Sequence, residues 1–442
     1  MKRLTVFFSI VGLLFLLVAC PSQETTEVAN PGDTTGCTIT PTLSSNIPHE
    51  VSVILPDGYS GLDTIVQVCF DAFSWEEFVA LNWPANSDGT PQSGQIGSDP
   101  TAKRVWEYYL DAEVVFDPGT QLVATNDGNK GLFRFSKGFL SSGDTIALHN
   151  EFTQATTQPL VDQNGNYVLY EIKLNNDEVT YLDTSGLTTL AGQQAKTVNF
   201  PAGSEAGLEG AIEVKATWKL LGANDDTSKY YTREANITID PQYTASGQTL
   251  HVTAEVALVA MHIIHKTERF PAWIWTSFQH KDNQPVTGET PNGTYAFYDP
   301  ACPSDTCPIN TPPDTPYVWQ DTMPYAGANL INGHGTQVVQ MLPIPDYTEG
   351  INAQWQALLQ GTVWANYELL GSQWQVVQDI FPADTVDVPT LHSNAVVETY
   401  FQQSSCLSSC HTLATDAAGK NADFSFVLLL GLQEHEAEVC IF

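Results

Sequence analysis

The sequence predicts a mainly β protein: an antiparallel sandwich or barrel-like body with flanking α-helices and a short helical segment at the C-terminus. Three observations lead to this fold class. The centre of the chain contains long stretches in which apolar and polar residues alternate, as in half-buried strands. Asp-Gly and Asn-Gly dipeptides, which favour tight turns, separate these stretches. Stretches with helical spacing lie on both sides of them.

The clearest expected strand spans residues 211–218, where apolar and charged side chains alternate. Ile212 and Val214 would lie on one face of a sheet, and Glu213 and Lys215 on the other, because successive side chains of a strand point to opposite sides. The same reasoning predicts three further strands, at residues 167–174, 230–239 and 250–264.

Helices are expected before and after these strands. Ser74 is followed three residues later by Glu77, which is the spacing of a capping box at the start of a helix. Asp99 and the proline after it would begin another helix. Towards the C-terminus, the spacing of apolar residues predicts helices over 351–370 and 394–403.

The N-terminus has the features of an export signal. Lys2 and Arg3 precede an apolar run that is too short for a comfortable transmembrane helix. The run ends in Leu-Val-Ala followed by Cys20, which resembles the lipobox of bacterial lipoproteins, where cleavage precedes the cysteine and its sulfur carries the lipid. We therefore expect a cell-envelope protein whose lipid anchor binds the outer membrane or the cell surface.

These features divide the chain into four parts. Residues 1–19 would be a lipoprotein signal peptide, and residues 20–48, which are polar and rich in Pro, Gly and Thr, a lipidated flexible tether. Residues 49–393 would form the β-rich body with its flanking helices. Residues 394–442 would form a short C-terminal segment.

The charge balance restricts the partners. The chain has 17 Lys and Arg residues against 50 Asp and Glu, a formal net charge of −33 at pH 7. Such an acidic protein repels phosphate backbones, so nucleic-acid binding is excluded and cationic partners are favoured.

Seven cysteines remain when Cys20 is set aside, and an exported chain should oxidise those within reach of one another. Cys302 and Cys307 lie close together in a turn-rich loop, where we expect a disulfide. Cys37 and Cys69 are a second, weaker pairing.

The C-terminal stretch "SSCLSSCHTLATD" contains Cys406, Cys410 and His411, and differs from the Cys-x-x-Cys-His site of c-type haem by one added residue. Cys410 and His411 still offer a thiol for a haem vinyl group and an imidazole for the iron. Cys406 could form the second thioether bond, or a disulfide with Cys440. A local disulfide between Cys406 and Cys410, with an incidental His411, is the remaining interpretation, because residues four apart on a helix are within bridging range.

Several stretches occur together in an order that resembles a known family. They are "FSWEEFVALNWPA", "AIEVKATWKLL", "MHIIHKT", "WIWTSFQHKDN", "ETYFQQSSCLSSCH" and "DFSFVLL". The chain resembles a family of exported bacterial proteins described as cytochrome-c-like, which end in a Cys-x-x-Cys-His motif, and the resemblance covers most of the mature chain. It implies a haem attached to Cys410 with His411 as the proximal ligand. The added residue is a departure that puts the bond to Cys406 in doubt.

A haem at this motif would have to dock on the β-rich body, because only 32 residues follow Cys410. The body would then supply a distal ligand or leave that position open. Sequence distance does not rank the candidates, which are Met323, Met341, His262, His265, His280, His334 and His392.

A second metal site is conceivable at His262, His265 and His280, because three neutral imidazoles can bind zinc, copper or non-haem iron. His262 and His265 would lie on opposite faces of a strand, which is the structure that this stretch predicts.

The sequence thus favours a lipid-anchored protein with one covalent haem, acting in electron transfer with redox partner proteins or in redox chemistry at that haem. Whether it is an enzyme is left open. The alternatives are a binding or structural protein whose C-terminal cysteines form only disulfides, and a metalloenzyme that uses the three histidines.

Overall fold

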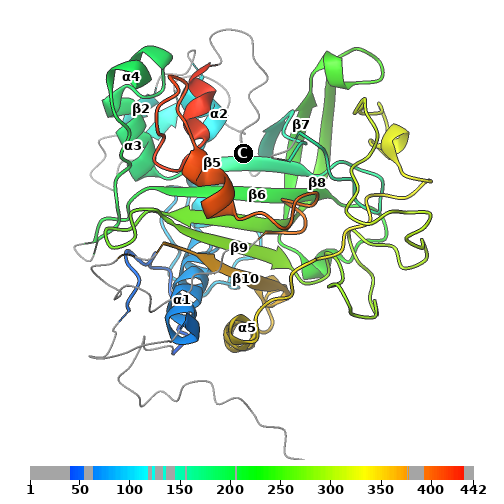
Figure 1. Ribbon diagram of the computed structural model, residues 1–442, viewed down its shortest axis with the longest axis horizontal. Helices are drawn as coiled ribbons and strands as arrows, with labels where there is room; N and C mark the ends of the chain where they lie inside the picture. Colours follow the sequence, from blue (N-terminus) through cyan, green and yellow to red (C-terminus); the bar gives the residue numbers. More distant parts are fainter. Residues whose placement is uncertain are drawn as a thin grey trace, which may run out of the picture.

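The computed structural model describes residues 40–53, 63–117, 122–124, 133–135, 145–154, 157–204, 207–375, 377 and 393–432. Within these ranges the chain is mainly β, a curled sheet with helices on its flanks and short helical turns near the C-terminus (Figure 1). The predicted fold class is therefore confirmed.

An eight-stranded sheet forms the centre of the molecule, in the order β1-β5-β6-β8-β7-β4, with β9 on β8 and β10 on β9. Its pairs are antiparallel except for β4 and β7, which run parallel. The strands are β1 (Leu110–Asp111), β4 (Ile146–His149), β5 (Leu169–Leu174), β6 (Ile212–Leu220), β7 (Thr232–Ile239), β8 (Leu250–His265), β9 (Ile274–His280) and β10 (Tyr367–Gln373). A separate pair joins β2 (Leu122–Ala124) to β3 (Phe133–Phe135).

The long strand β8 organises the sheet. One edge of β8 pairs with β6, and the other edge pairs first with β7 and then with β9. The predicted strands thus form β5, β6, β7 and β8, and β8 is long enough to pair with two strands on one edge.

The first face of the sheet carries the main core. Val214 of β6 and Met261 of β8 point to this face, together with Phe278 of β9, which stacks at 4.1 Å on Phe78. Phe78 belongs to helix α1 (Asp63–Leu81), which lies against β9 and β10 in Figure 1. Burying an aromatic side chain of this size contributes about 2–3 kcal/mol, so this face anchors α1 firmly.

The second face of the sheet is covered by the C-terminal segment, residues 393–432, drawn orange to red in Figure 1. Leu407 and Leu428 of this segment pack in one hydrophobic cluster with Ile264, Trp273 and Trp275 of the sheet region. Both faces are therefore covered, which explains why β6 is buried along almost its whole length.

Short helices connect and flank the strands. Besides α1 they are α2 (Ala112–Phe116), α3 (Asn176–Ser185), α4 (Leu190–Ala195) and α5 (Asp346–Leu358). Single helical turns form η1 (Val105–Tyr108), η2 (Thr227–Lys229), η3 (Pro241–Tyr243), η4 (Gly327–Asn329), η5 (Val363–Asn366), η6 (Cys406–Cys410), η7 (His411–Leu413) and η8 (Val427–Leu432). In the ranges that the structure covers, no helix combines the length and the apolar character that crossing a bilayer requires.

The predicted capping box at Ser74 is wrong. Helix α1 begins at Asp63, so Ser74 and Glu77 lie inside it. The Ser74 hydroxyl contacts the Thr276 hydroxyl of β9 at 2.7 Å, and Glu77 is fully buried. The helix continues upstream because the apolar residues there pack on the sheet, and such packing outweighs a local start signal.

Three further helix predictions are wrong in part or whole. Helix α5 ends at Leu358, although a helix was expected as far as residue 370. Residues 363–366 form the turn η5, and residues 367–370 begin β10, whose backbone pairs with β9. The expected helix from Asp99 is reduced to the single turn η1. Residues 394–403 form turns, and the Asn394 side chain donates to the Phe278 carbonyl of β9 at 3.0 Å.

Candidate functional site

A pocket lies between the second face of the sheet and the C-terminal segment. Its enclosed cavity has a volume of about 70 Å³, and about 730 Å³ of space lies in it when the open mouth is included. The sheet contributes Ile172, Glu213, Lys215, His262, Ile264 and Trp275, and the C-terminal segment contributes Glu398, Phe401, Ser404, Ser405, Cys406, Cys410 and His411. The structure thus brings the whole C-terminal motif and one of the three strand histidines into a single pocket.

The added residue of the motif is accommodated by a π turn. Residues 406–410 form one turn of π-helix, in which the His411 N–H is bonded to the Cys406 carbonyl. A π turn holds about one residue more than an α turn. Cys406 and Cys410 therefore lie at the two ends of one turn. In a Cys-x-x-Cys motif, with one residue fewer, an α turn would give the same arrangement. Both cysteines line the pocket.

This turn is fixed from both sides. The Ser405 hydroxyl accepts a hydrogen bond from the Ser408 N–H at 3.0 Å, as an N-cap does. From β10, the Gln373 amide accepts from the Leu407 N–H at 3.2 Å and donates to the Ser405 hydroxyl at 3.1 Å. The two cysteines are thus held on a turn that the sheet itself positions.

Cys406 and Cys410 are not bonded to each other. The local Cys406–Cys410 disulfide is therefore not formed in this structure. Cys440 lies outside the described residues, so the Cys406–Cys440 disulfide stays a prediction. Burial raises the pKa of Cys406 well above its ordinary value, and it also raises the pKa of the half-buried Cys410. Neither thiol is suited to be a thiolate nucleophile, which needs a lowered pKa.

His411 is held in one tautomer. Its Nδ1 lies 2.8 Å from the Phe424 carbonyl oxygen. Because a carbonyl only accepts, Nδ1 carries the proton and Nε2 carries the lone pair. Burial lowers the pKa of His411 to about 4, so the ring is neutral at physiological pH. The ring packs against Trp275 and Phe426, with ring centres 4.3 Å and 5.0 Å apart.

The backbone around His411 is strained. Asp423 and Phe424 have φ values of 53° and 72°, and Trp273 has φ of 65°. Non-glycine residues rarely adopt this left-handed region, and each costs on the order of 1–3 kcal/mol. The surroundings hold these conformations: the Trp273 indole donates to the Asp423 carbonyl at 2.9 Å, and Lys266 pairs with the Asp423 carboxylate. The carbonyl that His411 contacts belongs to Phe424, one of these residues.

Charged groups line the sheet side of the pocket. Lys215 and His262 are cross-strand neighbours on β6 and β8. The Glu398 carboxylate lies 3.7 Å from His262 Nε2 and accepts a hydrogen bond from the Asn394 N–H at 2.7 Å. Burial raises the pKa of Glu398 to about 7 and lowers the pKa of Lys215. The Lys215 ammonium lies 5.3 Å from the centre of the Tyr170 ring.

His265 and His280 do not join His262. His265 pairs with Ile274 on β9 and points to the opposite face of the sheet, as its spacing from His262 predicts. Its ring lies 2.8 Å from the Glu77 carboxylate, fully buried. His280 is three residues from Ser277, the β9 partner of His262, so its side chain points to the opposite face of the sheet. Its ring lies 3.1 Å from the Lys229 carbonyl. The expected three-histidine metal site is therefore not formed.

Lys215, Glu398 and Trp275 are pocket residues that sequence reasoning missed. Lys215 carried a usable signal, because it is two residues from Glu213 on the charged side of an otherwise apolar strand. Glu398 and Trp275 carried none, since neither their spacing nor their neighbours distinguishes them from surface and core residues.

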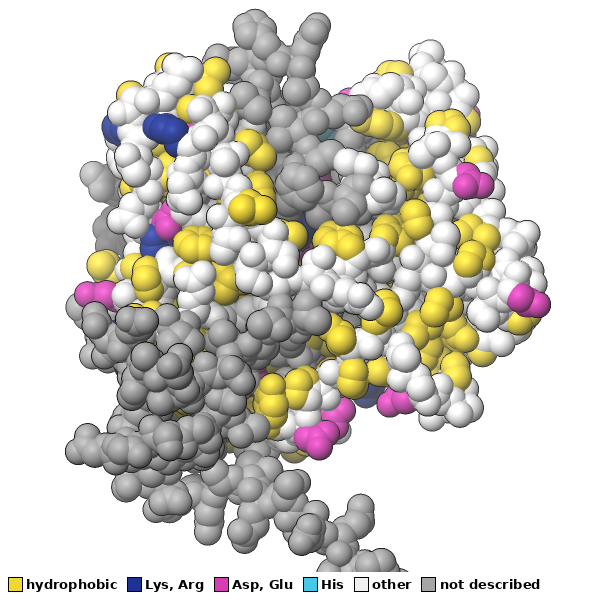
Figure 2. All heavy atoms as spheres, viewed as in Figure 1, with side chains coloured by type: hydrophobic (Ala, Val, Ile, Leu, Met, Phe, Trp, Pro, Cys, Tyr) yellow, Lys and Arg dark blue, Asp and Glu magenta, His cyan; other side chains and the backbone are white. Residues whose placement is uncertain are grey.

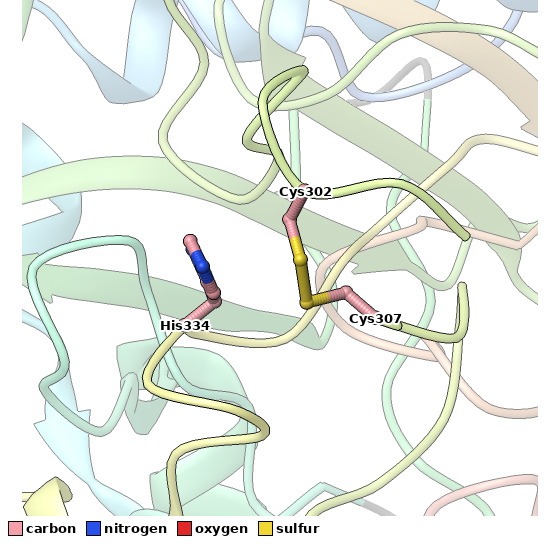
Figure 3. Close-up of side chains that lie close together, drawn as sticks. All are labelled: Cys302, Cys307 and His334. Atoms are coloured by element: carbon pink, nitrogen blue, oxygen red, sulfur yellow. A yellow bond between two sulfur atoms is a disulfide. The ribbon is translucent and has the colours of Figure 1, made fainter. Parts of the chain in front are cut away.

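The predicted disulfide between Cys302 and Cys307 is confirmed, with Cα atoms 5.9 Å apart (Figure 3). His334 lies beside it, and among the described residues this is the one group of three metal-ligating side chains. The sulfurs bond to each other, so neither is the thiolate that a metal binds. His334 itself lies 3.1 Å from the Asp299 carboxylate.

Other predicted residues fall outside the described part of the chain. Cys69 is disulfide-bonded, but its predicted partner Cys37 lies there, as do the lipidation site Cys20 and His392. These assignments stay predictions. Comparison of the chain with family models, curated proteins and solved structures finds no match.

Proposed function

We propose that the chain is a lipid-anchored envelope protein with one covalent haem that transfers electrons. Cys410 and Cys406 would form the thioether bonds, and His411 would bind the iron. One observation carries this proposal: the π turn absorbs the added residue, so that Cys406, Cys410 and His411 line the same pocket.

The residues of the pocket fit this cofactor. Its sheet wall offers the apolar side chains of Ile172, Ile264 and Trp275, which suit a flat hydrophobic ring. His411 is neutral, and its Nε2 lone pair is available because Nδ1 is bonded to a carbonyl. This is the usual arrangement of a metal-binding histidine. Haem bound here would supply a one-electron redox centre.

The chain's own residues would prepare the site. The Phe424 carbonyl fixes the orientation of the His411 ring, while Trp275 and Phe426 pack against that ring. Lys215 is the lysine that lines the pocket and can offset a carboxylate of the cofactor.

The charge of the chain supports electron exchange with a basic protein partner. The formal net charge is −33, and Figure 2 shows acidic side chains at several separate places on the face that carries the C-terminal segment. Such a surface attracts a positively charged redox protein and accelerates its association at low salt. A lipid on Cys20 would keep the protein at the membrane where such partners work.

The test is covalent haem. The chain is expressed with a cytochrome c maturation system, denatured, and its pyridine haemochrome spectrum recorded. We expect a haem that stays with the polypeptide, with the α-band position of two thioether bonds. Cys406→Ser should shift this band to the single-thioether position, and Cys410→Ser should shift it or abolish attachment.

The matched control is His251→Ala, which removes an exposed histidine at the far end of β8. It should retain the wild-type spectrum. A wild-type protein that folds but carries no covalent haem would refute the proposal and would favour a binding or structural protein instead.

A further inference from the structure

Lys215 is the residue of β6 that opens into the pocket. The other eight residues of this strand are buried, whereas Lys215 is partly accessible and lines the pocket. Within the described ranges its ammonium forms no hydrogen bond or ion pair, and Nζ lies 5.3 Å from the centre of the Tyr170 ring. The polar atoms that are buried without a partner include His262 Nε2 but not Lys215 Nζ. The amine is therefore accessible from the pocket.

Apolar side chains surround this amine. Ile172 is the cross-strand neighbour of Lys215 on β5, and Ile264, Trp275 and Phe401 line the same pocket. Burial disfavours the charged form of an amine, and it lowers the pKa of Lys215. The neutral amine has a lone pair, so a lysine in such surroundings is a nucleophile that attacks the carbon of a carbonyl group.

A carboxyl group lies on the neighbouring strand position. His262 is the cross-strand neighbour of Lys215 on β8, and Glu398 Oε2 lies 3.7 Å from His262 Nε2. The same oxygen accepts the hydrogen bond from the Asn394 N–H, whereas Oε1 is not among the buried oxygens that lack a partner. Oε1 is thus the oxygen accessible from the pocket. Because burial raises the pKa of Glu398 to about 7, this group can both donate and accept a proton near neutral pH.

The enclosed part of the pocket limits the ligand to a small molecule. Its volume is about 70 Å³, and the open mouth gives access to it. A dry cavity of about 150 Å³ holds one molecule of benzene, so this cavity suits a molecule with about half as many heavy atoms. An aldehyde of about two or three carbons has this size, and its carbonyl carbon is what a neutral amine attacks.

We propose that Lys215 forms an imine with a small aldehyde in this pocket, with Glu398 as the acid–base group. The amine nitrogen attacks the carbonyl carbon, a C–N bond forms, and a proton moves from nitrogen to oxygen to give a carbinolamine. Glu398 then donates a proton to the hydroxyl group, the C–O bond breaks and water leaves. The nitrogen returns a proton to the Glu398 carboxylate as the neutral imine forms, so no oxidant or reductant is needed. This inference goes beyond the proposed function, because it involves neither the iron nor the two cysteines.

The test traps the imine by reduction. The full chain is incubated with acetaldehyde and excess sodium cyanoborohydride at neutral pH, and peptide mapping by mass spectrometry locates the ethyl groups. We expect Lys215 to be ethylated before the exposed Lys281. Benzaldehyde, which is too large for the enclosed cavity, should label Lys281 but not Lys215. This comparison uses the wild-type protein, so it does not depend on the folding of any variant.

Two variants test the roles of the side chains. Lys215→Met should lose the rapidly formed adduct, and the matched control Lys281→Met should keep it. Glu398→Gln should slow the labelling of Lys215 by about a hundredfold, the lower end of what general acid–base catalysis contributes, whereas Glu289→Gln should not.

Ethylation of Lys215 no faster than that of Lys281, or equal labelling of Lys215 by benzaldehyde, would overturn the inference. The content of covalent haem is measured on the same preparation. Its absence would refute the proposed function and leave this inference intact.

Discussion

Replacing Glu398 by glutamine should change how the stability of the protein depends on pH. Burial raises the pKa of Glu398 to about 7, from the ordinary 4.5 of a glutamic acid. Between these two values the folded state binds more protons at this site than the unfolded state, so stability falls as the pH rises through the window. At about 1.4 kcal/mol per pKa unit, the wild-type protein should lose about 2.5 kcal/mol between pH 5 and pH 8 through this group alone.

Glutamine has the same shape but does not ionise, so Glu398→Gln should be spared this loss. The measurement is urea unfolding at pH 5 and pH 8, followed by tryptophan fluorescence, on protein made without haem maturation so that no cofactor alters the surroundings of Glu398. The matched control is Glu289→Gln, which removes an exposed carboxylate from a loop and should follow the wild type. Equal losses of stability in wild type and Glu398→Gln would refute the reasoning.

Three other perturbations test the structure. Gly335→Ala should destabilise the protein by about 2 kcal/mol in thermal unfolding, because its Cβ would lie 2.1 Å from a backbone carbonyl oxygen; Gly293→Ala, where the nearest atom is 3.8 Å away, should be tolerated. Asp423→Asn should lower the free energy of unfolding by about 3 kcal/mol, because it breaks the ion pair with the buried Lys266. It should also speed proteolytic release of the C-terminal segment, and an unchanged rate of cleavage would contradict this. Replacing both cysteines of the 302–307 disulfide by serine should lower the free energy of unfolding in urea by about 2 kcal/mol, since the closed loop is short. A larger loss would show that the disulfide stabilises more of the protein than its own loop.

Local patterns were sufficient for the four strands β5, β6, β7 and β8. The alternation around Lys215 predicted both the strand β6 and which side chains leave its apolar face, because a strand repeats every two residues whatever surrounds it. The same period placed His262 and His265 on opposite faces. The disulfide of residues 302–307 was equally local, since a short loop brings its own ends together.

Helix boundaries were less predictable. Helical spacing continues into the first residues of β10, yet the backbone there pairs with β9, which lies about ninety residues earlier in the chain. Ser74 matches a helix start but sits within α1, where its hydroxyl contacts Thr276. In both cases a partner distant in sequence outweighed a local preference, and such a partner leaves no mark on the local pattern.

The sequence by itself determined the mainly β fold class, the short loop disulfide, and the thiols and imidazole of the C-terminal motif. Only the tertiary structure decided which other side chains lie near these groups. It placed His262 and His411 in one pocket although about 150 residues separate them, and it sent His265 to the other side of the sheet. It also showed that a π turn absorbs the added residue between Cys406 and Cys410. The physical reason is that side-chain direction follows from the nearest few residues, whereas proximity follows from strand pairing and from the packing of the C-terminal segment on the sheet.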